Sequence, residues 1–238
     1  MDAYEPVNAV RFVTATNLFD GHDASINIFR RILQASGAEV IHLGHNRSAG
    51  EVAAAVVEED AQAVAVTSYQ GGHMEYFRYL RELLDAAGRT DVRIFGGGGG
   101  TILPEEAELL ASEGVARIFS PDDGRQMGLQ GMIDEMLRAS DVASGELGEV
   151  DVETLSTDST MMIASLLSAK ENHPDKYPDV FERVRARAAS WPGRVLGITG
   201  TGGSGKSSLT DELVRRFLMD FASETVAVLS VDPTRRRS

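Results

Sequence analysis

The chain has 238 residues, no cysteine and a formal net charge of −13 at pH 7. That length allows one large domain or two smaller ones, and we expect two. The lack of cysteine excludes disulfides, thiolate metal sites and cysteine nucleophiles, and the acidic balance argues against a broad nucleic-acid-binding surface. No basic amino-terminal segment precedes an apolar one, and no apolar run reaches membrane-spanning length. We therefore expect a cytoplasmic protein that binds neither nucleic acid nor a membrane.

Strand and helix patterns alternate five times between Val10 and Arg138. The expected strands cover residues 10–14, 39–42, 63–67, 92–95 and 116–119, and the amphipathic helices between them include residues 26–33, 51–59 and 76–87. Pro104 with two glutamates behind it fits the first turn of the fourth helix. This alternation predicts an α/β domain, a flavodoxin-like doubly wound parallel sheet, which we place at residues 1–140.

The stretch Phe19-Asp20-Gly21-His22-Asp23-Ala24-Ser25 lies between the first expected strand and the first expected helix. In an open parallel sheet such loops lie at the carboxyl ends of the strands, where ligands bind. A metal-ligating imidazole needs its second ring nitrogen held by an acceptor, and Asp20 can be that acceptor for His22. A loop histidine beside an aspartate is more often a solvated surface pair. The neighbouring loops are therefore needed to decide between a metal ligand and a surface pair.

Two further strand ends carry unusual residues. Ser68-Tyr69-Gln70-Gly71-Gly72-His73 follows the third strand, and Gly96 to Gly100 with Thr101 follow the fourth. Five successive glycines are costly in backbone entropy, and their physical use is to let a bulky ligand lie against the main chain. A flexible linker explains the run poorly, because it lies between a strand and a helix that starts with proline.

Together these three loops resemble the cobalamin-binding domain of the adenosylcobalamin-dependent mutases and methionine synthase, which carries Asp-x-His-x-x-Gly, Ser-x-Leu and a glycine-rich turn. The resemblance implies adenosylcobalamin as the cofactor, His22 as the lower cobalt ligand, and a slot between the sheet and the first helix for the displaced nucleotide tail. The chain departs from the pattern at Ser25, where the family has glycine, and at Gln70, where it has leucine. The implied cofactor contacts are Asp20, Gly21, His22, Asp23, Ser25, Ile26, Ser68, Tyr69, Gln70, Gly71, Gly97, Gly98, Gly99, Gly100 and Thr101.

Two other flavodoxin-like functions fit the residues poorly. A phosphorylation receiver needs an aspartate where Ser68 stands and a lysine where Phe119 and Ser120 stand. A flavin mononucleotide carrier needs a phosphate loop after the first strand, where Asp20 and Asp23 would repel a phosphate. The remaining histidines have no paired ligands at metal spacing, and only His73, beside a site loop, is a candidate corrin contact.

Residues 139–158 lose periodicity and predict a linker, followed by a short apolar helix at residues 161–167 and an arginine-rich helix at residues 180–189. We interpret the methionine pair of the first of these helices as packing residues. Residues 141–192 are therefore expected to form a helical linker.

A phosphate-binding loop follows the linker. After an expected strand at residues 195–199, Gly200-Thr201-Gly202-Gly203-Ser204-Gly205-Lys206-Ser207 fits G-x-x-x-x-G-K-[ST], and a helix is expected from Ser208 to about Phe221. Backbone amides of such a loop converge on phosphates, its lysine reaches the terminal phosphates, and its last hydroxyl ligates magnesium. The expected nucleotide contacts are Gly200, Gly202, Gly203, Ser204, Gly205, Lys206, Ser207 and Ser208.

A further strand is expected at residues 225–231, and Asp232-Pro233 follow it. The Val-Asp-Pro sequence resembles the metallochaperone GTPases that service cobalamin mutases, which implies GTP with Mg²⁺ and places Asp232 in the magnesium site. We expect residues 193–238 to be the truncated start of a P-loop α/β domain. Two strands and one helix cannot bury both faces of a parallel sheet, so this part should be loosely ordered. GTP hydrolysis also needs a magnesium-binding aspartate on a later strand and a residue that positions the attacking water, so we expect no GTP hydrolysis by this part alone.

The order of carrier domain, linker and G-protein start resembles the amino-terminal part of the fused acyl-CoA mutases. The resemblance implies an isomerase that interconverts isobutyryl-CoA and butyryl-CoA by adenosylcobalamin radical chemistry, with GTPase-linked cofactor loading. It also implies a homodimer and an acyl-CoA substrate bound by a mutase barrel that this chain does not contain. No residue here is assigned to the rearrangement. A corrinoid carrier or a cobalamin sensor with an attached nucleotide switch remains the alternative.

Overall fold

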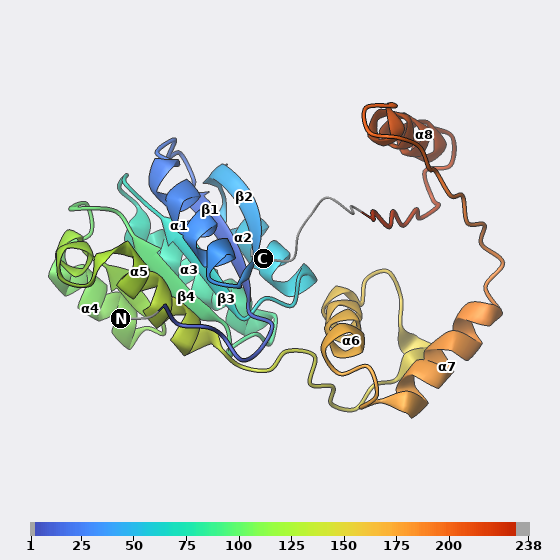
Figure 1. Ribbon diagram of the computed structural model, residues 1–238, viewed down its shortest axis with the longest axis horizontal. Helices are drawn as coiled ribbons and strands as arrows, with labels where there is room; N and C mark the ends of the chain where they lie inside the picture. Colours follow the sequence, from blue (N-terminus) through green and yellow to red (C-terminus); the bar gives the residue numbers. More distant parts are fainter. Residues whose placement is uncertain (1–2, 232–238) are drawn as a thin grey trace. The chain divides into compact units, whose positions relative to one another are not determined.

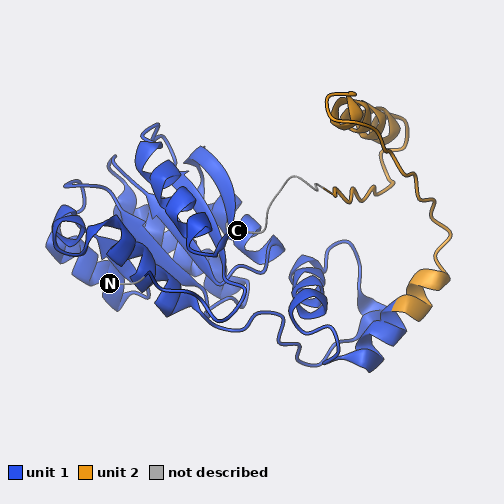
Figure 2. Cartoon of the chain, in the orientation of Figure 1, with its two compact units in different colours: residues 1–184, 237–238 blue, residues 185–236 orange. Residues whose placement is uncertain are grey.

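The computed structural model describes residues 3–231. Its contacts divide the chain into two compact units, the first ending at Val184 and the second beginning at Arg185 (Figure 2). The two units are described separately below.

The first unit is built on a sheet of five parallel strands in the order β2-β1-β3-β4-β5 (Figure 1). The strands are β1 (Arg11–Asn17), β2 (Glu39–Arg47), β3 (Ala63–Thr67), β4 (Arg93–Gly97) and β5 (Arg117–Phe119). This is the strand order of flavodoxin-like folds, so the predicted fold class is confirmed. The order reverses between β1 and β3, and ligands of such sheets bind beyond the carboxyl ends of the strands at that point.

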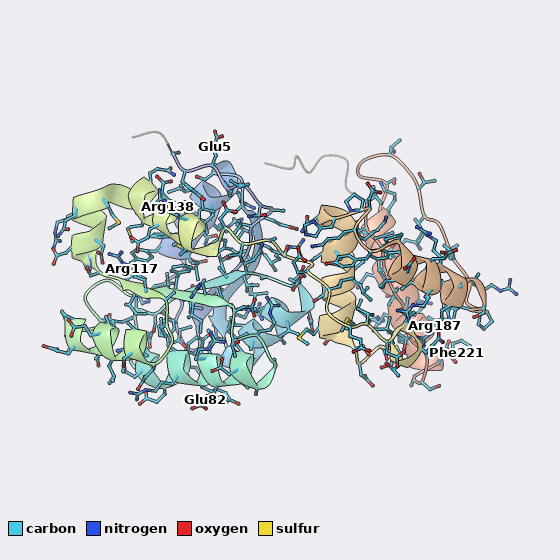
Figure 3. All side chains as sticks on the ribbon, turned by 90° about the horizontal axis from the view of Figure 1, so that it is seen from below. Glu5, Glu82, Arg117, Arg138, Arg187 and Phe221 are labelled. Carbon is cyan, nitrogen blue, oxygen red and sulfur yellow. The ribbon has the colours of Figure 1, made fainter. Side chains whose placement is uncertain are left out.

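Five helices cover the two faces of the sheet. They are α1 (Ala24–Ala35), α2 (Ala49–Glu58), α3 (His73–Ala86), α4 (Pro104–Ser112) and α5 (Pro121–Ser140). Helices α1 and α5 pack on one face, and α2, α3 and α4 pack on the other. Figure 3 shows these layers, with Glu5 and Glu82 at opposite outer surfaces.

The central strand β3 shows why the sheet needs both layers. All five of its residues are buried. Ala63 and Ala65 face the α1 and α5 side, whereas Val64 and Val66 face the α2 and α3 side. Because side chains alternate between faces along a strand, a strand covered on both sides is apolar throughout. The continuous apolar run that predicted this strand is therefore a direct consequence of its central position.

Among the five strands of the sheet, the largest difference from the expected boundaries is at β2, which continues to Arg47 instead of ending at His42. This strand lies at the edge of the sheet, and its second half is only partly buried. An edge strand tolerates polar side chains because one of its sides has no strand partner. The prediction of β2 therefore ended at His42, because the apolar pattern on which it relied does not continue through the polar residues that follow.

The linker is more structured than the sequence suggested. Helix α5 runs to Ser140, and the Asp141 carboxylate after it accepts hydrogen bonds from the backbone amides of Val7 and Asn8 at 2.7 and 2.9 Å. The short helix η1 (Val152–Thr154) and the helices α6 (Thr160–Asn172) and α7 (Pro178–Ala189) follow. The two predicted linker helices are confirmed. Residues 139–158, predicted as a linker, are partly ordered by packing, because Val152 is buried in a small apolar cluster.

The second unit contains the helix α8 (Lys206–Asp220). The strands predicted at residues 195–199 and 225–231 are not formed, and this prediction was wrong for the described residues. A strand is stable only beside a hydrogen-bonding neighbour, and residues 185–231 contain no strand and bury no side chain. Among the helices that the structure describes, none has the length and apolar character needed to cross a bilayer.

Candidate functional site

Asp20 connects the loops that follow β1 and β3. Its Oδ1 atom accepts a hydrogen bond from the backbone amide of His22 at 2.9 Å and lies 2.7 Å from Nδ1 of the same residue. Its Oδ2 atom accepts a hydrogen bond from the backbone amide of Tyr69 at 2.5 Å. Both carboxylate oxygens thus accept hydrogen bonds between the loops after β1 and β3, where the strand order reverses.

The environment of Asp20 keeps its carboxylate ionised. Burial alone would raise the pKa of Asp20, but the hydrogen bonds from the amides of His22 and Tyr69 and from the His22 ring outweigh burial, and the pKa lies below its ordinary value. An ionised carboxylate can only accept, so Nδ1 of His22 carries the proton. Nε2 is then the nitrogen with a free lone pair, on a side chain that is 68% exposed. This is the arrangement that a metal-ligating imidazole requires.

Tyr69 and Ser68 occupy different positions in the β3 loop. The Tyr69 ring lies 5.8 Å from the His22 ring, and its hydroxyl lies 2.6 Å from Oγ of Ser25 in α1. Ser68 is fully buried, and its Oγ accepts a hydrogen bond from Nδ2 of Asn17 at 2.8 Å. Ser68, a predicted cofactor contact, therefore joins β3 to β1, whereas Tyr69 lines the cavity described next.

A cavity of about 310 Å³ lies between the carboxyl ends of β3, β4 and β5 and the helices α1 and α5. Its predicted lining residues are Ser25, Ile26, Tyr69, Gly97, Gly98 and Gly99. Gln70, Gly71 and Gly100 are exposed and do not line it, and Thr101 instead donates its hydroxyl to the Tyr69 carbonyl at 3.4 Å. The cavity occupies the place of the slot predicted between the sheet and the first helix.

The sequence reasoning missed most of the cavity lining. Gly96 belongs to the predicted glycine run, and the missed residues are Phe29, Ala65, Val66, Thr67, Phe95, Phe119, Ser120, Pro121, Gly124, Leu129, Met132 and Met136. Ser120 could have indicated this side of the cavity from the sequence, because it follows the fifth strand. In the structure it caps α5 by accepting a hydrogen bond from the Asp123 amide at 3.2 Å. The methionines of α5 had no signal of their own, because only the fold brings them to the first helix.

The glycine run brings two loops together as well as lining the cavity. A Cβ atom on Gly98 would lie 1.8 Å from the carbonyl oxygen of Ser68, and one on Gly96 would lie 2.4 Å from Cζ of Phe77. Gly99 has a φ of +60°, whereas a Cβ on Gly100 would meet nothing within 4 Å. The close approach of the β4 loop to the β3 loop therefore requires glycine at position 98 even without a ligand.

His73 does not reach the candidate site. It begins α3, is 7% exposed, and places Nε2 3.0 Å from a carboxylate oxygen of Glu106 in α4. We therefore assign it to the packing of α3 against α4 and not to a ligand. Among the described residues there is no group of three or more histidine, aspartate or glutamate side chains that could hold a metal ion, so a metal here would depend on one protein ligand and a cofactor.

The phosphate-binding loop forms its helix but not its strand. Gly205 has a φ of +81° and caps α8, and Nζ of Lys206 donates a hydrogen bond to the Thr201 carbonyl at 2.7 Å. The glycines and serines of the loop, from Gly200 to Ser208, are exposed. Asp232, the predicted magnesium residue, lies outside the described residues. The nucleotide contacts therefore remain predictions.

The sheet order, the histidine backed by a buried carboxylate and the glycine-walled cavity define a flavodoxin-like domain suited to a corrinoid. In agreement, residues 10–130 match the family model described as "B12 binding domain", and the chain belongs to that family. Residues 161–238 match the model described as "Methylmalonyl Co-A mutase-associated GTPase MeaB". The predicted cofactors, cobalamin for the first domain and GTP for the second, are confirmed by these matches.

The chain is similar to proteins named fused isobutyryl-CoA mutase. It is 53% identical over 243 residues to the one from Geobacillus kaustophilus (strain HTA426), covering 99% of this chain and 22% of the relative. It is 56% identical over 236 residues to the one from Nocardia farcinica (strain IFM 10152), covering 98% of this chain and 22% of the relative. The chain thus spans about a fifth of the length of these relatives, and the predicted resemblance to fused mutases is confirmed.

A small subunit of another acyl-CoA mutase is similar to part of this chain. The pivalyl-CoA mutase small subunit of Xanthobacter autotrophicus (strain ATCC BAA-1158 / Py2) is 33% identical over 108 residues, which are 45% of this chain and 70% of that subunit.

Proposed function

We propose that this chain is the cobalamin-carrying and G-protein part of a fused acyl-CoA mutase that interconverts isobutyryl-CoA and butyryl-CoA. The names of the relatives, which are similar over nearly the whole chain, support this assignment. In this proposal residues 1–140 form the carrier domain, residues 141–192 the linker and residues 193–238 the beginning of the GTPase domain. The acyl-CoA binds to a mutase barrel outside this chain, and the longer protein is a cytoplasmic homodimer.

The Asp20–His22 pair carries the proposal. In this proposal His22 would bind the cobalt of the cofactor through Nε2, and Asp20 holds the opposite ring nitrogen at 2.7 Å. An acceptor in this position orients the ring and raises the basicity of the ligating nitrogen. Asp20 also accepts a hydrogen bond from the Tyr69 amide. The orientation of the His22 ring therefore depends on the loop after β3 as well as on the loop after β1 that carries His22.

The cavity beside the pair fits a displaced nucleotide tail. Its lining is mostly apolar, with hydroxyls from Ser25, Tyr69 and Ser120 at its polar positions, as expected for a site that buries a flat base and orients it by a few polar groups. The glycines on its β4 side leave the backbone open to close approach. The residues present therefore fit the cofactor that the family takes.

When bound, adenosylcobalamin would supply the radical chemistry of the proposed reaction. The residues of this chain hold the cofactor: His22 binds the metal, Asp20 keeps the Nδ1 proton in place, and the cavity walls exclude water from the tail. In the proposed protein the P-loop domain, with Lys206 and Ser207 at the phosphates and Asp232 at the magnesium ion, serves cofactor loading.

Paramagnetic resonance of the cob(II)alamin complex tests the ligand assignment. Protein labelled with heavy nitrogen should change the nitrogen splitting of the cobalt signal, because the ligand then comes from the protein and not from the cofactor. His22→Ala should abolish that change and weaken binding, whereas His45→Ala, at an exposed position of β2, should keep it. A label-dependent splitting that survives in His22→Ala would rule out this ligand.

Conversion of isobutyryl-CoA by the full-length protein, dependent on added cobalamin, tests the activity.

A further inference from the structure

Phe19 occupies a turn position that normally belongs to glycine. The backbone amide of Asp20 donates a hydrogen bond to the carbonyl of Asn17 at 3.1 Å, which closes a four-residue turn at the end of β1. Phe19 is the third residue of this turn and has a φ of 63°. A positive φ at that position is the pattern of a type II turn, which favours glycine or asparagine there. A bulky residue in this conformation is a true outlier.

The side chain of Phe19 gains nothing from the fold. It is 79% exposed, although Asn17 and Asp20, the first and last residues of the turn, are buried. A glycine would satisfy the turn without strain, and a polar residue would suit the solvent. Neither packing nor turn geometry therefore explains a phenylalanine at this position.

The strained conformation is held in place from a neighbouring strand. The backbone amide of Phe19 donates a hydrogen bond to Oδ1 of Asn46 at 2.7 Å. Asn46 lies at the end of β2 and itself has a φ of 57°. Residues kept in rare backbone regions by their surroundings concentrate at ligand sites. The turn that presents the ring of Phe19 also delivers Asp20 and His22, so any group bound to His22 lies over the same loop.

We propose that Phe19 is a contact for the corrin ring of the cofactor held at His22, an inference that rests on the proposed function. The nucleotide tail has the cavity between α1 and α5, but a ring bound to the exposed His22 lies outside that cavity, at the edge of the sheet where Phe19 is exposed. A broad ring with apolar edges gives the exposed aromatic side chain a partner and removes both from water. The fold accepts a strained phenylalanine because the cofactor covers it.

Replacing Phe19 tests the proposal, because stability and binding should respond in opposite directions. Phe19→Gly suits the positive φ, so the apo protein should unfold at the same or a higher temperature. Its affinity for cobalamin should fall about tenfold to a hundredfold, the range for removing one aromatic side chain from a buried contact. Phe19→Asn, also tolerated in this turn, should show the same loss. Tyr79→Ala in α3, which removes a 53% exposed aromatic ring away from the loop, should bind as the wild type does.

Cobinamide, which has the corrin ring but no nucleotide tail, locates the contact. If Phe19 contacts the corrin, Phe19→Gly should weaken cobinamide and cobalamin binding by the same factor. Wild-type affinity for cobalamin in Phe19→Gly, or a loss confined to cobalamin, would overturn the proposal. Either result leaves the ligand role of His22 intact, provided that the label-dependent nitrogen splitting is present. Absence of that splitting in the wild type would instead defeat the proposed function and this inference with it.

Discussion

Asp20 and His22 form a pair in which one side chain is fully buried and the other is exposed: Oδ1 of Asp20 lies 2.7 Å from Nδ1 of His22, and their side-chain exposures are 0% and 68%. The buried partner is anchored in turn by the Tyr69 amide. The exposed ring is therefore oriented by the interior of the domain, which pre-organises Nε2 for a ligand approaching from solvent.

Asp20→Asn should weaken cobalamin binding about 10- to 100-fold, the usual cost of losing the partner of a metal-bound histidine. The amide is neutral and holds the Nδ1 proton less strongly than the carboxylate does. Isothermal titration with cobalamin gives the affinity, and Asp158→Asn, at an exposed position outside the α/β domain, is the matched control. Wild-type affinity in Asp20→Asn would show that the pair does not act on the ligand.

Acid unfolding should report the ionised state of Asp20. The pKa of this carboxyl is lowered below its ordinary value of 3.8 by hydrogen bonds that outweigh its burial. A lowered pKa stabilises the folded protein above the ordinary value, and this contribution is lost as the pH falls through the folded-state pKa. Urea unfolding of the apo protein should therefore show a steeper loss of stability below about pH 4 in the wild type than in Asp20→Asn. Equal slopes would contradict the assignment.

Gly98→Ala should destabilise the first unit by about 1–3 kcal/mol or more, the cost of forcing atoms into a closely packed site. The added Cβ would lie 1.8 Å from the Ser68 carbonyl oxygen, and a backbone atom cannot yield as the end of a side chain can. Gly100→Ala meets nothing within 4 Å and should change stability by less than about 0.5 kcal/mol. Urea unfolding of the two variants makes the comparison. Equal stabilities would show that the β3 and β4 loops do not approach as closely as described.

Gly124→Leu should separate tail binding from corrin binding. Gly124 lines the cavity at the start of α5, and a Cβ there would meet only the Met132 sulfur, at 3.9 Å. The variant should fold with unchanged or higher stability, since leucine is a better helix former than glycine. Its side chain would occupy tail space, so affinity for cobalamin should fall about tenfold or more while that for cobinamide stays unchanged. Equal losses for both ligands would place the tail elsewhere.

Hydrogen exchange should divide the chain at the boundary of the two units. Residues 185–231 contain only the end of α7 and the helix α8 and bury no side chain, whereas β1 and β3 are buried almost throughout. Few buried contacts imply opening at low free energy, so the amides of the second unit should exchange fast and those of the central strands slowly.

We also expect no GTP turnover by the chain of 238 residues. Turnover that Lys206→Ala abolishes would contradict this expectation.

The local sequence determined the elements whose signals are short-range. The strand β3 was predicted at its observed bounds because its sequence is a short, mainly apolar run, the pattern of a central strand covered on both faces in α/β folds. Pro104 marked the first residue of α4, and the Asp20–His22 spacing predicted the hydrogen bond that the structure contains. The phosphate-loop motif predicted the helix at Lys206. Each of these depends on residues that are neighbours along the chain.

The tertiary structure decided every feature that depends on residues far apart in the chain. The cavity has one wall from α1 and another from α5, about a hundred residues later. Asn46 holds the left-handed Phe19 from another strand, and the requirement for glycine at position 98 comes from the Ser68 carbonyl. The strand pattern at residues 195–199 failed for the same reason, since apolar periodicity marks a segment that can pair but only a neighbouring strand makes it pair. Sequence identifies candidate groups, and packing decides which of them meet.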